Sequence, residues 1–197
     1  WNNNAYNFKD VNIKNNDFQA EIDGDYFHGK QDKRSIDMDV NISNIVISEL
    51  KKYYPKQLGE KILHWLDTSL LKGVARNTAI KINGKLTDFP FVDENNMPDQ
   101  GKGLFTVSSS VKNSFIEYGK GWPELDAFDF NIMVNNNYIK LIGLEGNLQG
   151  NNIKNMEVII DSFDIEEPIM KVNVILDSPV NKIINAIVTT LLDIKSI

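Results

Sequence analysis

The 197-residue chain contains no cysteine, which excludes disulfide bridges, thiolate metal sites and cysteine nucleophiles. Histidine is nearly as scarce: only His28 and His64 occur, so little is available for imidazole catalysis or metal ligation. No apolar run approaches the roughly 18 residues that a membrane span requires, and no signal segment opens the chain. Because it begins at Trp1 without a methionine, we expect an internal piece of a longer protein.

A segregated basic patch is also missing. The formal charge is −6, and the densest basic stretch, Lys30 to Arg34, is interrupted by Gln31 and Asp32. This stretch is typical of a solvated hairpin tip, and a phosphate backbone would be repelled by the rest of the surface. We therefore expect no nucleic-acid partner. The 42% hydrophobic and 24% charged residues indicate a folded chain with a real core.

Complete catalytic sets are absent from the residue inventory. The serine run Ser108-Ser109-Ser110 has no Gly-x-Ser-x-Gly elbow around it, and Gly101-Lys102-Gly103 is too short for a phosphate loop. Asp23-Gly24-Asp25 lacks the glutamate that completes a calcium-binding EF-hand loop. The carboxylate pairs are interpreted as solvated and not as buried acid–base groups; they are Asp37/Asp39, Asp93/Glu94 and Glu166/Glu167. We expect no enzyme, no metal and no cofactor, and a hydrolase is the least favoured reading.

What the chain has in abundance is period-two alternation of apolar and polar residues, which predicts strands with one dry and one wet face. Ser35 to Ser43 alternates without an error. The other predicted strand segments are Asp17–Asp23, Ile80–Thr87, Phe105–Val111, Phe128–Val134, Tyr138–Leu148, Ile153–Ile160 and Met170–Leu176. Turn signals lie between several of these runs, at residues 23–25, 119–121, 135–137 and 150–152, and short connections favour an antiparallel meander.

Two regions break the alternation with helical spacing. A helical hairpin is predicted over about residues 44–72: Ser43 would cap its first helix, Pro55 would separate the two helices, and Gly73 would end the second. A third helix is predicted over about residues 180–194, after Ser178-Pro179. Residues 92–101 form a polar loop. The expected fold is mainly β (α+β), a curved antiparallel meander, with residues 1–197 as one β-rich unit.

This prediction creates a problem of area. A sheet of about eight to ten strands with one apolar face must hide that face, because each exposed apolar Å² costs ~25 cal/mol. Three short helices cannot cover it. The sheet must curl on itself, pack as a sandwich, or present a trough that an apolar ligand or a neighbouring segment fills.

Several motifs resemble the central region of the YhdP family of AsmA-like, TamB-related envelope proteins. Tyr54-Pro55 followed by Trp65-Leu66-Asp67 is similar to the family's Tyr-Leu-Pro segment and Trp-Leu helix, with Tyr54 standing in place of the leucine. The segment from Gly84 to Phe91 resembles Gly-x-Leu-x-x-Phe-Pro-Phe. The remaining matches keep the family's order: Gly103-Leu104-Phe105, Ile116-Glu117-Tyr118, Trp122-Pro123, Gly150 and Asp161-Ser162-Phe163.

The resemblance implies a non-enzymatic, periplasmic part of an inner-membrane-anchored protein. Its β-sheet would form an apolar groove that shields phospholipid or other acyl-chain lipid between the inner and outer membranes and so supports outer-membrane integrity. Expected partners are lipid, the rest of the same polypeptide and other envelope proteins. The candidate lipid-binding residues of the apolar inner surface are Ile80, Ile82, Leu86, Phe105, Val107, Phe128, Phe130, Ile132, Ile139 and Leu141.

A second hypothesis stays open: an envelope scaffold or protein-interaction module that pairs through sheet edges and carries no lipid. Two tryptophan positions also allow two interpretations. Trp65 and the Trp122-Pro123 pair are interpreted mainly as packing residues, since buried aromatic rings contribute large contact areas. The alternative places Trp122 at the rim of a groove, in contact with lipid.

Overall fold

The computed structural model describes residues 4–29, 34–54, 63, 67–117, 123–163, 165 and 168–184. The described residues form one sheet of nine strands together with two short 3₁₀ helices. The helices are η1 (Ile47–Tyr53) and η2 (Leu86–Asp88). The strands are β1 (Asn4–Lys14), β2 (Phe18–His28), β3 (Arg34–Val46), β4 (Leu70–Lys85), β5 (Gly103–Ile116), β6 (Leu125–Asn135), β7 (Tyr138–Leu148), β8 (Asn151–Ile160) and β9 (Met170–Asp177).

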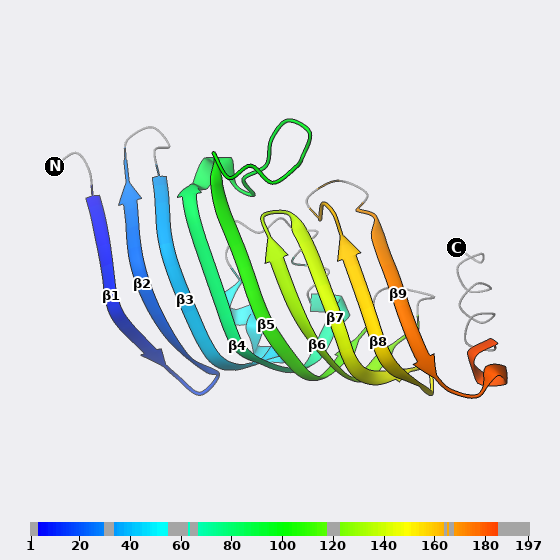
Figure 1. The fold of residues 1–197 in the computed structure, drawn as a ribbon. Helices are drawn as coiled ribbons and strands as arrows, with labels where there is room; N and C mark the ends of the chain where they lie inside the picture. The colour runs from blue at the N-terminus through cyan, green and yellow to red at the C-terminus, as the bar shows by residue number, and fades with distance from the viewer. Residues whose placement is uncertain are drawn as a thin grey trace.

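The strands lie side by side in chain order, and every neighbouring pair is antiparallel (Figure 1). This arrangement confirms the predicted mainly β meander. It also leaves the sheet open, because the described strands do not close β1 onto β9. The outer edges of β1 and β9 therefore remain unpaired among the described residues.

The cross-strand register places apolar side chains opposite one another along the whole sheet. Met38 lies opposite Ile82, and Ile82 lies opposite Phe105. The same holds for Val107 and Val134, because directly opposed residues share one face. We call this side of the sheet the apolar face.

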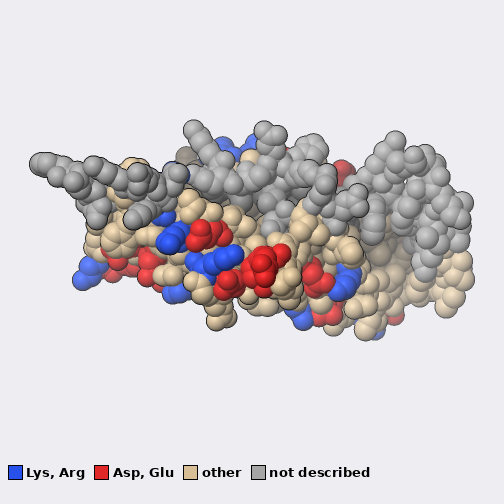
Figure 2. Space-filling view, turned by 90° about the horizontal axis from the view of Figure 1, so that it is seen from above, with Lys and Arg blue, Asp and Glu red and all other residues tan. Residues whose placement is uncertain are grey.

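The other side, which we call the charged face, carries cross-strand ion pairs. Figure 2 shows acidic and basic residues gathered along one long side of the molecule. The closest N–O distances of four such pairs are 3.1 Å for Lys81–Asp39, 2.7 Å for Lys112–Asp129, 2.7 Å for Lys140–Glu157 and 3.0 Å for Lys154–Asp177. Apart from Asp129, these side chains keep about a third or more of their surface exposed, so the pairs made by Lys81, Lys140 and Lys154 contribute little stability and mainly keep this face hydrated.

A series of β-bulges bends the strands in their lower parts (Figure 1). Register shifts interrupt the ladders next to Asp10, Asn77, Asn113 and Ala127. These four residues have positive φ angles of 51°, 50°, 51° and 47°. An extra residue in one strand bends it and increases its twist. The bulges thus give the sheet the curvature that the sequence predicted only in general terms.

The core lies on the apolar face around and beyond these bulges, mainly on β5 to β8. Leu125 and Phe128 are fully buried, and η1, which lies behind the sheet above the bent strand ends, contributes Ile47 (Figure 1). Gly143 and Gly146 leave the space that the Phe128 ring occupies, since a Cβ atom at Gly143 would lie 2.6 Å from that ring.

The first helix of the predicted hairpin is shorter than predicted and begins later. β3 continues through Val46, and only residues 47–53 are helical, as η1. Ser43 caps no helix, because it is a strand residue whose hydroxyl donates to the Gln19 carbonyl at 3.3 Å. Ile45 pairs with Phe18 and Ala75 and is 3% exposed, so ladder bonds and burial outweigh the helical spacing.

The second predicted helix is corrected at its end. Residues 67–69 are helical, but β4 begins at Leu70, and Gly73 lies inside β4, where it ends no helix. Residues 55–62 and 64–66 of that prediction lie outside the described residues. At the C-terminus residues 180–184 are helical, and the Pro179 carbonyl accepts the Lys182 and Ile183 N–H groups; residues 185–194 lie outside the described part.

Some of the predicted turns form in the structure and others do not. Asn136 and Asn137 form the predicted β6–β7 turn. The β7–β8 turn lies at residues 149–150, one residue before the predicted 150–152, because Asn151 and Asn152 belong to β8. The turn predicted at Asp23-Gly24-Asp25 is wrong, because Gly24 lies inside β2 opposite Met38. A Cβ atom there would lie 2.1 Å from the Asp37 carbonyl oxygen, so Gly24 allows close strand approach. The predicted turn at 119–121 lies outside the described residues.

The packing of the Phe128 ring against Gly143 gives a first prediction. Gly143→Ala should lower the free energy of unfolding by about 1–3 kcal/mol, because the new methyl group overpacks a fully buried ring. Urea unfolding of the 197-residue chain measures this. Ser108→Ala on the charged face is the control and should change stability by less than about 0.5 kcal/mol. Equal losses in both variants would show that the glycine is not needed there.

Asp129 gives a second prediction, on pH. Burial alone would raise the pKa of Asp129, but the Lys112 ammonium at 2.7 Å and the Asn113 N–H at 2.7 Å outweigh it and lower the pKa. A lowered folded-state pKa stabilises the fold above the unfolded-state pKa of about 4, and this contribution is lost as pH falls through the folded value.

Unfolding free energies of the wild type and Asp129→Asn, measured from pH 7 to pH 3, test this linkage. The wild type should be the more stable at pH 7, and the difference should shrink as the pH falls. A difference that stays constant over the whole range would contradict the assignment.

Candidate functional site

The candidate site is the part of the apolar face that keeps surface accessible. Along the upper strands the apolar side chains are half-buried, in contrast to the closed core around and beyond the bulges. Among the described elements, η1 packs on β3 and β4 in the bent part, and η2 contacts β3 at one end. We call the half-buried set the open apolar face; it comprises Ile36, Met38, Val40, Ile80, Ile82, Phe105, Val107, Ile132, Val134, Ile139 and Ile160.

Six of the ten sequence-predicted lipid-contacting residues lie together on this face. Ile80 lies between Val40 and Val107, and Ile82 lies between Met38 and Phe105. Val107 lies opposite Val134, which is followed across the sheet by Ile139. Ile132 packs at the border between the open apolar face and the core. These residues come from β4 to β7 and form one continuous apolar surface.

The structure places the other four predicted residues elsewhere. Phe128, Phe130 and Leu141 are 0%, 2% and 9% exposed, so they belong to the closed core and not to an accessible surface. The bulge at Ala127 and the space left by Gly143 let Phe128 and Phe130 stack at 5.3 Å between ring centroids. Leu86 is not a strand residue, because β4 ends at Lys85 and Leu86 begins η2.

The sequence did not identify β3 as part of the open apolar face. Ile36, Met38 and Val40 belong to the open apolar face, and they come from the segment whose alternation is free of errors. That signal identified the dry face of β3. It could not show which strands β3 would join, because the register depends on pairing between distant segments.

The open apolar face offers almost no polar group to a ligand. Thr78 and Ser109 interrupt it, and their hydroxyl oxygens lie 2.8 Å apart in a hydrogen bond with each other. Ser109 also lies 3.4 Å from the Arg76 carbonyl oxygen. The hydroxyl groups are therefore satisfied within the sheet, and the other members of the open apolar face are apolar side chains.

The described catalytic candidates, Ser108, Asp39 and His28, do not form a common site. Ser108 is exposed, and Asp39 on the charged face pairs with Lys81. His28 ends β2 with its Nδ1 atom 3.4 Å from the Tyr26 hydroxyl. No group of three or more metal-ligating side chains is found among the described residues. His64, Trp65, Trp122, Glu166 and Glu167 lie outside those residues.

The Asp93 carboxylate has a structural position. It accepts the Met97 and Asn95 N–H groups at 2.9 and 2.8 Å within the loop after η2. These backbone hydrogen bonds, that of Met97 first, lower the pKa of Asp93. Asp93 therefore stays ionised and holds the loop in shape, whereas a general acid would need a raised pKa. Its neighbour Glu94 is exposed.

Comparisons with known proteins add one finding to this geometry. No curated protein and no solved structure matches the chain. In the described part of the chain, no helix has the length and apolar character needed to cross a bilayer. The family described as YhdP protein, however, matches residues 1–196. The chain therefore belongs to the YhdP family.

Proposed function

We propose that this chain is a non-enzymatic segment of an envelope protein whose open apolar face shields the acyl chains of phospholipid. The single observation that carries the proposal is the half-buried aliphatic surface across β3 to β8. Exposed apolar surface costs ~25 cal/mol per Å² in water, so a face of this extent is stabilised when hydrocarbon covers it.

The chemistry of the face favours acyl chains over ligands with directional groups. Its members are aliphatic and aromatic side chains, and its one polar pair, Thr78 and Ser109, is hydrogen-bonded internally. A ligand that needs specific donors or acceptors would find none offered on this surface. Acyl chains require only apolar contact, and the continuous row from Met38 through Ile82 to Phe105 supplies it.

Family membership supports the setting. The YhdP family fits a role in the cell envelope, and we propose the periplasmic side, in a protein anchored to the inner membrane. In that setting the groove would carry phospholipid between the inner and outer membranes and support outer-membrane integrity. Its partners would be lipid, the rest of the polypeptide and other envelope proteins, and not nucleic acid, given the charge of −6.

A second candidate function is an envelope scaffold that binds protein partners through its edges. One observation favours it: β9 has an unpaired outer edge among the described strands, and Val174 and Ile175 are 40% and 61% exposed there. An open, apolar edge strand is a template for pairing with another strand. The scaffold function would use the outer edge of β9, whereas lipid binding would use the open apolar face.

A charge on the open apolar face separates the two functions. Ile82→Glu should reduce the phospholipid that copurifies with the protein by roughly tenfold or more, because a carboxylate facing hydrocarbon costs about 2.5 kcal/mol or more and ~1.4 kcal/mol is a factor of ten in affinity. Mass spectrometry of extracted lipids from equal amounts of folded protein measures it.

Asn83→Glu provides the matched control, since it adds the same charge one residue away on the charged face. Its lipid content should equal that of the wild type. Wild-type protein without bound phospholipid would contradict lipid handling and favour the scaffold. Equal lipid in both variants would show that lipid binds elsewhere.

A further inference from the structure

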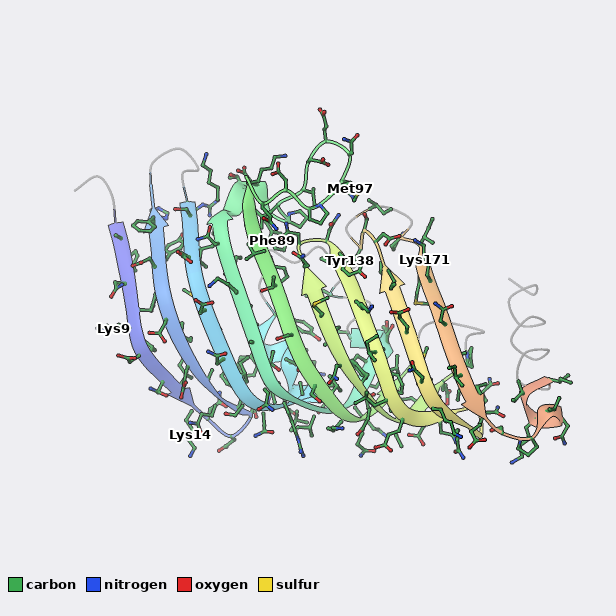
Figure 3. The ribbon with its side chains drawn as sticks, viewed as in Figure 1. Lys9, Lys14, Phe89, Met97, Tyr138 and Lys171 are labelled. Atoms are coloured by element: carbon green, nitrogen blue, oxygen red, sulfur yellow. The ribbon has the colours of Figure 1, made fainter. Side chains whose placement is uncertain are left out.

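Residues 86–102, which we call the rim segment, connect β4 to β5 and bring two aromatic rings to one end of the apolar face. The segment begins with η2 and continues through Phe89, Pro90 and Phe91. Figure 3 shows Phe89 near the upper end of β5 and Met97 farther out in the same segment. Met97 is 60% exposed. The two phenylalanines therefore lie close to the sheet, while the tip of the segment faces solvent.

Phe91 fixes the rim segment to the sheet. Its side chain is fully buried against Gly84 and Gly103, which lie opposite each other in β4 and β5. A Cβ atom at Gly84 or Gly103 would lie 2.6 or 2.5 Å from the Phe91 ring. Because the two glycines lack side chains, the ring can lie directly on the backbone of both strands.

Two buried asparagines hold the segment from the β6–β7 turn. Asn136 donates to the Phe91 carbonyl at 2.8 Å and accepts the Phe105 N–H at 2.8 Å. Asn137 donates to the Asn96 carbonyl at 2.9 Å. Both asparagines are 0% exposed, so these hydrogen bonds are shielded from competing water. The rim segment is thus a fixed part of the sheet's upper end.

Phe89 differs from Phe91 in keeping surface exposed. Its ring lies 5.3 Å from the Phe105 ring and 5.8 Å from the Phe91 ring, in edge-on contacts at 71° and 82°. Phe105 belongs to the open apolar face and lies opposite Ile82. Phe89 therefore extends the open apolar face beyond the strand end, on a support that burial and hydrogen bonds hold in place.

We propose that Phe89 is a positioning residue of the open apolar face: a fixed aromatic stop that contacts acyl chains where that face ends above β4 and β5. This inference rests on the proposed lipid-shielding function. The rigid support gives the stop a constant position, so it limits how far a chain extends past Phe105. Phe91, by contrast, is already covered by protein and contacts no ligand.

Photo-crosslinking in the intact protein tests the contact. The photoreactive residue benzoylphenylalanine replaces Phe89, Val107 on the open apolar face, or Ser108 on the charged face, in cells whose phospholipids carry radioactive phosphate. After irradiation, the protein with the probe at position 89 or 107 should carry severalfold more label than the protein with the probe at 108. Label at 107 but not at 89 would overturn the inference and leave the proposed function standing.

No label above that of position 108 at either site would overturn the proposed function, and the inference with it. A second variant isolates the stop. With the probe kept at position 107, Phe89→Ala should lower the label severalfold, because chains are no longer held at that depth. Thr87→Ala, an exposed position of the same segment, should leave it unchanged. Equal label in both variants would contradict a positioning role for Phe89.

Discussion

The structure depends on one constraint: cross-strand register must keep the apolar residues of nine strands on the same face. A slip of one residue in any pair would move that strand's apolar set to the charged face. The ladders prevent this because apolar residues lie opposite apolar residues on neighbouring strands, as in the row from Met38 through Ile82 to Phe105. Ion pairs such as Lys81–Asp39 lie directly behind this row and favour the same register.

The bulges reconcile this constraint with a stable fold. An open sheet with one exposed apolar face has little to bury, and its strands need an anchor. Around the bend next to Asp10, Asn77, Asn113 and Ala127, apolar side chains close into a core that includes Leu125 and Phe128, and the open apolar face lies above that core. The core holds the strands in register, so the upper face can remain half-buried. The bent part of the strands thus supplies most of the buried core, and the upper part keeps apolar surface accessible.

The sequence predicted the faces better than it predicted the connections. Alternation in Ser35–Ser43 and in Tyr138–Leu148 identified strands and their dry sides, because successive residues of a strand point to opposite faces of the sheet. The same reasoning placed Ile80, Ile82 and Val107 on one surface. It missed Met38 and Val40 as their neighbours, because pairing between strands leaves no local signal.

The errors have physical causes. Ile45, Val46 and Leu50 have helical spacing, but Ile45 lies in the ladder between Phe18 and Ala75, and tertiary pairing outweighs local propensity. Gly24 was interpreted as a turn residue, although its role is close packing between β2 and β3. Phe128 and Phe130 alternate like an open strand, and only the Ala127 bulge and the space at Gly143 explain their burial.

The most direct test of acyl-chain binding to the open apolar face is to measure lipid contact at successive residues of β5. The chain lacks cysteine, so single cysteines at positions 104 to 108 can be labelled with a fluorophore without altering native thiols. Phospholipid with brominated acyl chains quenches a fluorophore that it touches. Quenching should be strong at 105 and 107 and weak at 104, 106 and 108. Uniform or absent quenching across the five positions would contradict an acyl-chain site on the open apolar face.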